Sequence, residues 1–473
     1  MSNILLQDKH DIQQILQTTC QQALTFLTNL DHKAVAIKPE KKDLLALPQS
    51  GLGAILTLEK FKQRHEAHLS ASAGPRYFGF VTGGATPASI AGDWLTSAYD
   101  QNATGFGDSS APLIELETIQ LLKQLLNLAD DYVGVFVTGA TMANFAGLAL
   151  ARQWTTQQLG VDAAQSGLYG LPTIKVLSAT PHSSSIKSLS MLGMGRDCVQ
   201  LIPCLPGREA IDIAALEQSL LKLQNQPVIV IGSAGTVNTV DFDDLEALGK
   251  LKQRFNFWLH IDGAFGAFAA CSPKFSHLTK GLNFADSITV DAHKWLNVPY
   301  DSGIHFSRHI NLQQAVFQNY APYLGKPNLE EINFVHLTPE NSRRFRALPT
   351  WMTLMAYGRE GYQSIIEGDC ALAKSLESKL EQSSAFEILS EVYLNTVCFT
   401  LSEQFGSLTK ELIKEFLTQL TAAGKVFLTS TTYQEKPAIR AALSNWRTEK
   451  EDIDIVFESL EKVAKQFKEI MQS

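Results

Sequence analysis

The sequence predicts an α/β protein whose large domain is a mostly parallel sheet covered by helices. Short β-branched apolar segments alternate with helical patterns from about residue 130 to residue 290. A chain of 473 residues that is 45% hydrophobic and 19% charged is long enough for one large domain and at least one smaller unit. The strands expected in the large sheet are Val133–Val137, Ile174–Leu177, Val199–Ile202, Val228–Ile231, Trp258–Ile261 and Ile288–Val290.

Residues 1–73 are predicted to form an N-terminal helical arm. Apolar residues recur at helical spacing over 12–30 and 58–69, with a loop rich in Pro and Gly between them. Because this segment has too little apolar surface for a core of its own, we expect the arm to pack on the main body or on a second subunit.

The rest of the chain divides into a large domain, 74–345, and a smaller C-terminal α+β domain, 346–473. In the large domain the expected helices are 87–98, one that begins near Pro112, 144–153 and 245–255. The small domain is expected to contain helices 348–361, 370–381, 409–423 and 449–472 and strands 397–401 and 439–443.

Charge and composition exclude several classes of partner. The net charge is −8 and no Lys/Arg cluster stands out, which argues against nucleic acid; Arg343, Arg344 and Arg346 are expected to form local ion pairs. The six cysteines are scattered without CxxC or paired His spacing, so neither a disulfide framework nor a metal site is expected. No signal-peptide or membrane-spanning pattern is present. We therefore expect a cytoplasmic protein with no membrane partner.

Polar residues follow the predicted strands at the ends where they would share one edge. They are residues 138–141, His182, residues 233–236, Asp262 and the pair His293 and Lys294. In parallel sheets ligands gather at the carboxyl ends of the strands. The sequence therefore predicts one binding site along this edge.

Lys294 is the most informative residue in this set. It follows a buried strand and precedes Trp295 and Leu296, which form an apolar wall. An amine held against such a wall can act as a nucleophile toward an aldehyde, and Schiff-base chemistry with pyridoxal phosphate (PLP) is the obvious use. A solvated turn lysine is the alternative interpretation.

Four further elements each allow two interpretations. Residues 139–141 form either a phosphate cradle at a helix start or a tight turn. Asp262 pairs either with a protonated pyridine nitrogen or with a structural cation. His182 either stacks on a cofactor or makes turn hydrogen bonds. Arg440 binds either a substrate carboxylate or a structural acid.

As an ordered set, these motifs resemble the group II PLP-dependent amino acid decarboxylases, a family that includes the aromatic-amino-acid, histidine, glutamate and cysteine-sulfinate enzymes. The resemblance runs from about Gly74 to the C-terminus. It implies a PLP fold-type I protein with a sheet of the seven-stranded type, and a homodimer with active sites at the subunit interface. The motifs are His182-Ser183, Gly235-Thr236, His260-Ile261-Asp262-Gly263-Ala264, Asp291-Ala292-His293-Lys294-Trp295, Ser342-Arg343-Arg344, and Arg440 with Asn445.

The resemblance also implies a role for each matching residue. Lys294 would be the Schiff-base lysine, Asp262 the pyridinium partner and His182 the stacking histidine. Tyr323 would protonate the substrate Cα from a mobile loop, with Tyr320 as a competing candidate. The remaining cofactor contacts would be Gly139, Ala140, Thr141 and His293 at the phosphate, together with Thr236 and Ala264, and Arg440 would bind the substrate carboxylate.

The expected reaction is decarboxylation of an L-amino acid to its amine and CO2. No Lys or Arg lies between Arg76 and Lys123, whereas Phe80, Trp94, Tyr99 and Phe106 do. If this segment lines the side-chain pocket, an aromatic or neutral substrate is favoured over an acidic one, unless the other subunit supplies a cation. A glutamate- or aspartate-type decarboxylase, an aminotransferase, a carbon-carbon lyase and a catalytically silent PLP-binding protein are the alternatives.

Overall fold

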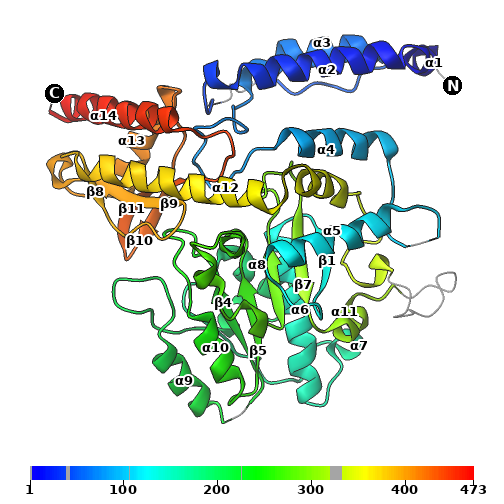
Figure 1. Cartoon of the computed structure of the whole chain (residues 1–473), viewed down its shortest axis with the longest axis vertical. Coiled ribbons are helices and arrows are strands. Elements are labelled where there is room, and N and C mark those ends of the chain that lie inside the picture. Colours follow the sequence, from blue (N-terminus) through cyan, green and yellow to red (C-terminus); the bar gives the residue numbers. More distant parts are fainter. Residues whose placement is uncertain (1–2, 39–42, 106, 225, 320–332, 473) are drawn as a thin grey trace.

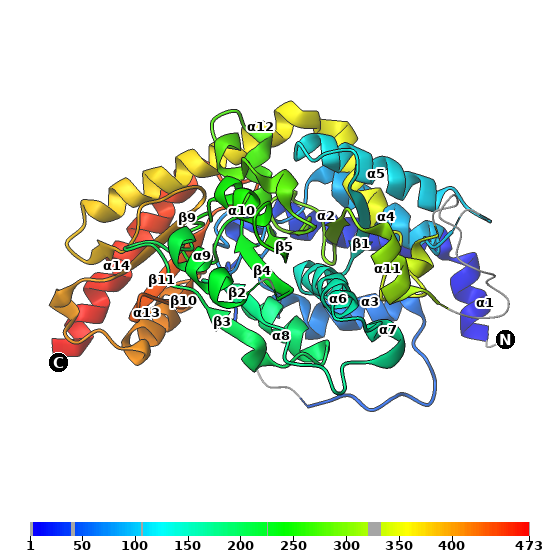
Figure 2. The same ribbon diagram turned by 90° about the horizontal axis from the view of Figure 1, so that it is seen from below.

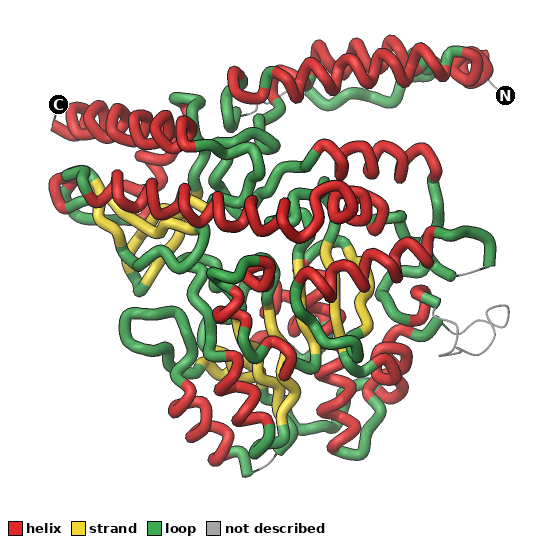
Figure 3. The backbone as a smooth tube through the Cα atoms, viewed as in Figure 1, coloured by secondary structure: helices red, strands yellow, loops and turns green. Residues whose placement is uncertain are grey.

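Two sheets and a projecting arm make up the chain in the computed structural model, which describes residues 3–38, 43–105, 107–224, 226–319 and 333–472. Figure 1 shows the large sheet and its helices in the lower part of the view, the small sheet beside α14, and the arm along the top. Figure 2 shows the same elements from below, and Figure 3 separates helices, strands and loops by colour.

The large sheet has seven strands, and six of them run parallel to one another. The α/β prediction is therefore confirmed. The antiparallel strand β7 was not predicted, because its sequence Gly-Ile-His-Phe-Ser lacks a β-branched run and its pairing with β1 and β6 is long-range. The order across the sheet is β1 (Val133–Val137), β7 (Gly303–Ser307), β6 (Ser287–Val290), β5 (Phe257–Asp262), β4 (Val228–Ser233), β2 (Val176–Ser178) and β3 (Val199–Leu201).

Both faces of this sheet are buried, and alternate residues of a strand point to opposite cores. In β5, Leu259 and Ile261 join the core beneath α10, whereas Trp258 joins the core on the α6 side. His260 and Asp262 continue the Trp258 face. The covering helices are α5 (Ala111–Leu125), α6 (Ala140–Gln158), α7 (Ala163–Ser166), α8 (Ser183–Met191), α9 (Ile213–Lys222), α10 (Leu245–Lys252) and α11 (Ile310–Phe317).

The long helix α12 (Ala347–Glu381) leads from the large sheet to the small one. The sequence predicted two separate helices here. They form one element. Its interruption lies at Gly358, inside the first predicted helix rather than between the two, where a φ of 57° and a ψ of −167° are not helical. The helix α4 (Pro87–Tyr99), predicted over 87–98, packs on α12. It has Pro87 in its first turn, and its N-cap is Thr86, whose side chain accepts the backbone N–H of Ser89.

The C-terminal unit is a four-stranded antiparallel sheet with two helices. Its β10 and β8 were not predicted, since β10 is rich in Thr and β8 has only three residues. Its elements are β8 (Phe386–Ile388), β9 (Thr396–Leu401), β10 (Thr429–Tyr433), β11 (Lys436–Ala442), α13 (Lys410–Ala422) and α14 (Lys450–Gln472).

The arm consists of α1 (Asn3–His10), α2 (Ile12–Thr28) and α3 (Ala54–Arg64), and none of these helices has a buried residue. Among the described residues, no helix is long and apolar enough to cross a membrane.

The three arginines at 343, 344 and 346 form ion pairs, as predicted. Arg343 pairs with Glu115 at 2.6 Å, and both side chains are almost fully buried. Arg344 pairs with Asp93 at 2.6 Å and Arg346 pairs with Asp301 at 2.9 Å. These pairs tie the segment before α12 to the large unit.

Candidate active site

A cavity of about 610 Å³ lies at the carboxyl ends of β4 and β5, against the small sheet. Six of the predicted catalytic, cofactor-binding and substrate-binding residues line it, together with Ser233, Val237 and Glu209. The six are His182, Thr236, Asp262, Ala264, Lys294 and Arg440.

Asp262 is the last residue of β5 and is 9% exposed. Its Oδ2 accepts a hydrogen bond from Asn144 Nδ2 at 2.9 Å, and its Oδ1 accepts one from the backbone N–H of Ala264 at 3.2 Å. The sequence predicted a cationic partner, but in the described part of the chain no cation forms an ion pair with Asp262. The carboxylate is held by neutral donors alone and faces the cavity.

Lys294 reaches the cavity from the turn after β6, and Trp295 and Leu296 behind it are fully buried, as predicted. Its ammonium lies 3.3 Å from Asp291 Oδ2, and the Phe265 ring centroid is 5.7 Å away. The wall beside the amine is therefore not purely apolar, because the turn supplies a carboxylate of its own.

Asp291 belongs to the motif around Lys294, but the sequence predicted no role for it. It also contacts His293 Nε2 at 3.3 Å and accepts the backbone N–H of Ala140 at 3.1 Å. Although burial raises the pKa of Asp291, the nearby Lys294 charge and the His293 hydrogen bond hold it below its usual range. Its position three residues before Lys294 was the available signal.

His182 is the N-cap of α8 and is open to the cavity. Its Nδ1 lies 2.7 Å from Ser184 Oγ and accepts the backbone N–H of Ser184 at 3.2 Å. Desolvation lowers the pKa of His182; Asp262 opposes this effect, and Lys294 adds to it. The imidazole is therefore neutral at pH 7.

Thr236 and Arg440 lie on the side of the cavity that faces the small sheet. The Thr236 hydroxyl donates to Glu209 Oε2 at 2.6 Å, so its hydrogen is already used within the protein. Arg440 lies in the middle of β11 rather than near its start, is 6% exposed and donates to the carbonyl oxygen of Val237. Burial lowers the pKa of Arg440 to about 10, so it stays charged at pH 7.

The predicted phosphate contacts do not line this cavity. Gly139, Ala140 and Thr141 form the start of α6, and the N–H of Ala140 is occupied by Asp291. A Cβ at Gly139 would lie 2.9 Å from His293 Cε1, so the helix start and His293 are in close contact beside the Lys294 turn.

Of the aromatic residues expected in the side-chain pocket, Phe80 lines the cavity, but Trp94 lines a different pocket beneath the arm. The predicted proton donor Tyr323, its alternative Tyr320, and Phe106 lie outside the described residues.

The residues present fit PLP. A carboxylate that has only neutral donors and faces a cavity can pair with a protonated pyridine nitrogen, and a primary amine in the same cavity can bond the aldehyde carbon. Both groups project from the ends of adjacent segments of one sheet, β5 and the turn after β6.

The comparisons with known proteins agree with this chemistry. The family model of the pyridoxal-dependent decarboxylase conserved domain matches residues 53–402. An aromatic-L-amino-acid decarboxylase of Bacillus atrophaeus is 31% identical over 393 residues, which cover 80% of this chain and 79% of that protein.

Two solved structures have the same fold. Oryza sativa TDC with PLP and tryptamine has a TM-score of 0.89 at 23% identity, covering 97% of this chain and 98% of that one. Catharanthus roseus tryptophan decarboxylase in complex with L-tryptophan has a TM-score of 0.87 at 21% identity, with the same coverage. The chain belongs to the pyridoxal-dependent decarboxylase family and is a PLP-dependent amino acid decarboxylase.

Proposed function

We propose that this enzyme converts an aromatic L-amino acid to its amine and CO2, using the cavity that contains Lys294 and Asp262. The relative from Bacillus atrophaeus is an aromatic-L-amino-acid decarboxylase, which supports the substrate class. The single observation that carries the proposal is the charge of the cavity: Lys294 and Arg440 are the only cations among its described lining residues.

Both of these cations have proposed tasks. Lys294 would hold the cofactor and Arg440 would bind the α-carboxylate, so neither is free for a second, side-chain carboxylate. An acidic side chain would then lie unpaired in a partly desolvated site, which is unfavourable. Phe80 and Phe265 instead offer apolar surface to an aromatic ring.

The proposed roles follow from how each residue is held. Bound PLP supplies an electron sink for the bond that breaks when CO2 leaves. Asp262 would keep the pyridine nitrogen protonated, since no cation among the described residues pairs with its carboxylate. His182 would lie against the ring from α8. Gly139, Ala140, Thr141 and His293 lie outside the cavity, beside the Lys294 turn, and the phosphate is assigned to them only by the resemblance to the family. Thr236 and Ala264 would border the ring.

The guanidinium of Arg440 would orient the substrate. Its Nη1 is fixed to the carbonyl oxygen of Val237, whereas its Nε has no hydrogen-bond partner in the described structure. A planar donor group with a free edge suits a carboxylate, and orientation of that carboxylate selects the bond that breaks. Tyr323 would return the proton to Cα.

The test is a panel of the twenty L-amino acids with the PLP-loaded enzyme, measuring CO2 and amine. We expect phenylalanine-, tyrosine-, tryptophan- or histidine-like rings to be preferred and glutamate and aspartate to be poor substrates. Faster turnover of glutamate than of any aromatic amino acid would contradict the proposal. Keto acid instead of CO2 would indicate an aminotransferase.

We also propose a cytoplasmic homodimer divided into an arm (1–73), a large domain (74–345) and a small domain (346–473). All six cysteines are free thiols, which supports a reducing compartment. The dimer is supported by the arm, whose three helices have no fully buried residue and carry exposed apolar side chains, among them Ile12, Leu16, Leu24 and Leu56.

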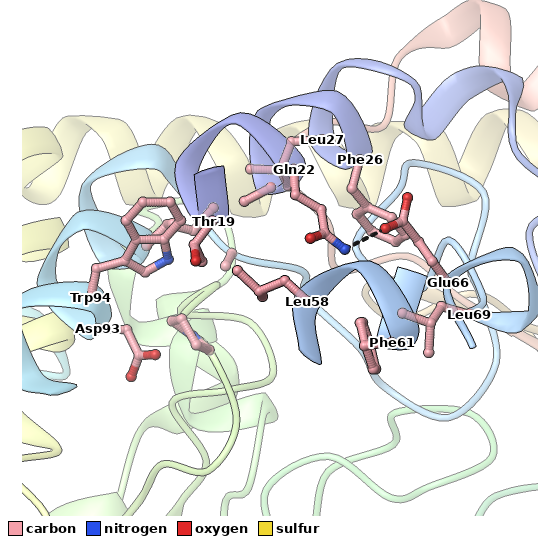
Figure 4. A pocket seen from close by; sticks show the side chains of 14 residues that line it. Thr19, Gln22, Phe26, Leu27, Leu58, Phe61, Glu66, Leu69, Asp93 and Trp94 are labelled. Carbon is pink, nitrogen blue, oxygen red and sulfur yellow. Dashed lines mark hydrogen bonds between the residues drawn. The ribbon is translucent and has the colours of Figure 1, made fainter. Parts of the chain in front are cut away.

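An apolar pocket of about 460 Å³ lies between the arm and α4. Figure 4 shows Phe26 and Leu58 of the arm and Trp94 of α4 among the side chains that line it. A second copy would cover this region and the arm. We expect a molar mass of twice 52.0 kDa by light scattering and dissociation in the double variant Leu16→Asp, Leu24→Asp. A wild-type protein that stays monomeric at micromolar concentration would contradict the dimer.

A further inference from the structure

Beneath the cavity, a buried set of polar side chains connects β5, β6, α6 and α8. Trp258, His260 and Asp262 alternate along β5 and so share the face toward α6. The set also includes Ser287 and Thr289 of β6, Asn144 of α6 and Ser184 of α8; Asn144, His260, Ser287, Thr289 and Trp258 are fully buried.

Asn144 lies at the centre of this set, and its amide orientation follows from its neighbours. Nδ2 is 2.9 Å from Asp262 Oδ2 and 2.9 Å from Ser184 Oγ. Oδ1 is 2.7 Å from the Thr289 hydroxyl and 2.9 Å from His260 Nε2. A rotated amide would place an oxygen against the Asp262 carboxylate, so both amide hydrogens point to Asp262 and Ser184.

The proton positions of His260 follow from this orientation. Because Asn144 Oδ1 can only accept, His260 Nε2 must carry a hydrogen. Desolvation lowers the pKa of His260 to about 4, so its Nδ1 is unprotonated and accepts from Ser287 Oγ at 2.8 Å. The Ser287 oxygen in turn accepts from Trp258 Nε1 at 3.0 Å. One assignment of hydrogen positions therefore gives each of these side chains a hydrogen-bond partner.

The hydrogen bonds continue from Asn144 through Ser184 to His182. Ser184 Oγ accepts from Asn144, so its own hydrogen is free to donate to His182 Nδ1 at 2.7 Å. The backbone N–H of Ser184 donates to the same nitrogen. His182 Nδ1 therefore has no hydrogen, and the neutral ring carries its proton on Nε2.

We propose that Asn144 is a positioning residue of the cofactor site: one amide hydrogen orients the Asp262 carboxylate, and the other directs the Ser184 hydroxyl hydrogen to His182 Nδ1, where it reinforces the Ser184 backbone N–H in holding the Nε2–H tautomer. This inference rests on the proposed roles of Asp262 and His182. Asn144 does not line the cavity, so it acts only through the two residues that do.

The chain offers a matched control on the same helix. Gln153 is fully buried and donates its Nε2 to an aspartate, Asp162, at 2.8 Å, but neither residue lines the cavity. The near-isosteric changes Asn144→Leu and Gln153→Met each remove one buried amide from α6. Only the first removes donors that serve Asp262 and Ser184.

The first measurement is the dissociation constant of PLP for the full-length apoprotein of four variants: N144L, Q153M, D262N and the double variant N144L/D262N. We expect about tenfold weaker binding for N144L and no change beyond about twofold for Q153M. If Asn144 acts through Asp262, the double variant binds PLP within about threefold of D262N alone. If the double variant instead loses PLP affinity by the product of the two single-variant factors, the inference is overturned.

The second measurement is ¹⁵N NMR of ring-labelled histidine in the apoprotein, with His182 assigned from a His182→Gln variant. We expect an unprotonated Nδ1 and a protonated Nε2 in the wild type and in Q153M, and a mixture of tautomers in N144L. A proton on Nδ1 in the wild type would overturn the inference without involving activity.

The D262N variant separates a failure of the proposed role of Asp262 from a failure of the role of Asn144. If D262N binds PLP as tightly as the wild type, the proposed role of Asp262 is wrong and the inference falls with it. If D262N binds weakly while N144L binds like Q153M, the role of Asp262 stands and only the inference about Asn144 is wrong.

Discussion

Asp369 provides a stability test that does not depend on the cofactor. It lies on α12 and accepts a hydrogen bond at 2.7 Å from Nε1 of Trp295. Trp295 is the residue after Lys294. Burial raises the pKa of Asp369 from 3.8 to about 8. Below pH 8 the folded protein therefore keeps this carboxyl protonated, whereas the unfolded chain releases its proton above about pH 4.

The sign of the pH dependence follows directly. The folded-state pKa is higher than the unfolded-state pKa, so the stability associated with Asp369 is greatest below pH 3.8 and declines as the pH rises toward 8. The decline is about 1.4 kcal/mol per pH unit, or about 3 kcal/mol between pH 5 and pH 7. Asp369→Asn cannot ionise but still offers an acceptor to Trp295.

The assay is denaturant unfolding of the apoprotein at pH 5, 6 and 7, comparing wild type with D369N. We expect the free energy of unfolding of D369N, relative to wild type, to rise by about 3 kcal/mol from pH 5 to pH 7. Equal pH profiles of the two proteins would refute the reasoning.

Asp286→Asn is the control with the opposite sign. Burial raises the pKa of Asp286, but His309 and Lys252 more than compensate, and the net pKa is below 3.8. Its stabilisation is present above pH 3.8 and is lost as the pH falls through its lowered folded-state pKa. D286N should therefore be destabilised throughout pH 5 to 7.

Three further predictions follow from the fold and the site. Glu115→Gln leaves the charge of Arg343 buried without its partner, so we expect denaturant titration to show a loss of about 3 to 5 kcal/mol in the free energy of unfolding. A loss under about 1 kcal/mol would contradict a desolvated ion pair. Lys294→Ala should yield no CO2 and no protein-bound cofactor after borohydride, measured by absorbance and mass spectrometry; retained label would place the attachment elsewhere. Tyr323→Phe should slow amine release and raise aldehyde side products, and an unchanged product distribution by chromatography would exclude Tyr323 as the proton donor.

The large sheet was predictable because burial on both faces leaves a local signature. Strands β1, β4, β5 and β6 are runs of Val, Ile, Leu and aromatic residues, and such runs predict buried parallel strands without knowledge of their neighbours. Strand β7 has no such signature, since its central His305 is fully buried between β1 and β6. Its existence depends on long-range pairing.

The interruption of α12 was predictable only in part. The sequence predicted helices over 348–361 and 370–381 and therefore a break between residues 361 and 370. The structure continues the helix through that stretch and interrupts it at Gly358 instead, inside the first predicted helix. Gly358 permits the positive φ of 57° that breaks the hydrogen-bonding pattern, and the open space around it would accept a side chain. The positive φ therefore explains why this position is a glycine, whereas close packing does not.

Some of the site residues could likewise be predicted from the sequence, and others could not. Asp262 and Lys294 could be named from the sequence because Asp262 ends a recognisable strand and Lys294 lies in the turn after another. Their shared edge follows from parallel topology alone. Asn144 could not, because its contacts come from three other elements and become neighbours only when β5, β6 and α8 pack on α6. The position of a carboxylate at a strand end can be read from the local sequence, but the contacts that fix its orientation are tertiary contacts. For this fold, strand ends therefore locate the reacting groups, and the side chains of the covering helix set their geometry.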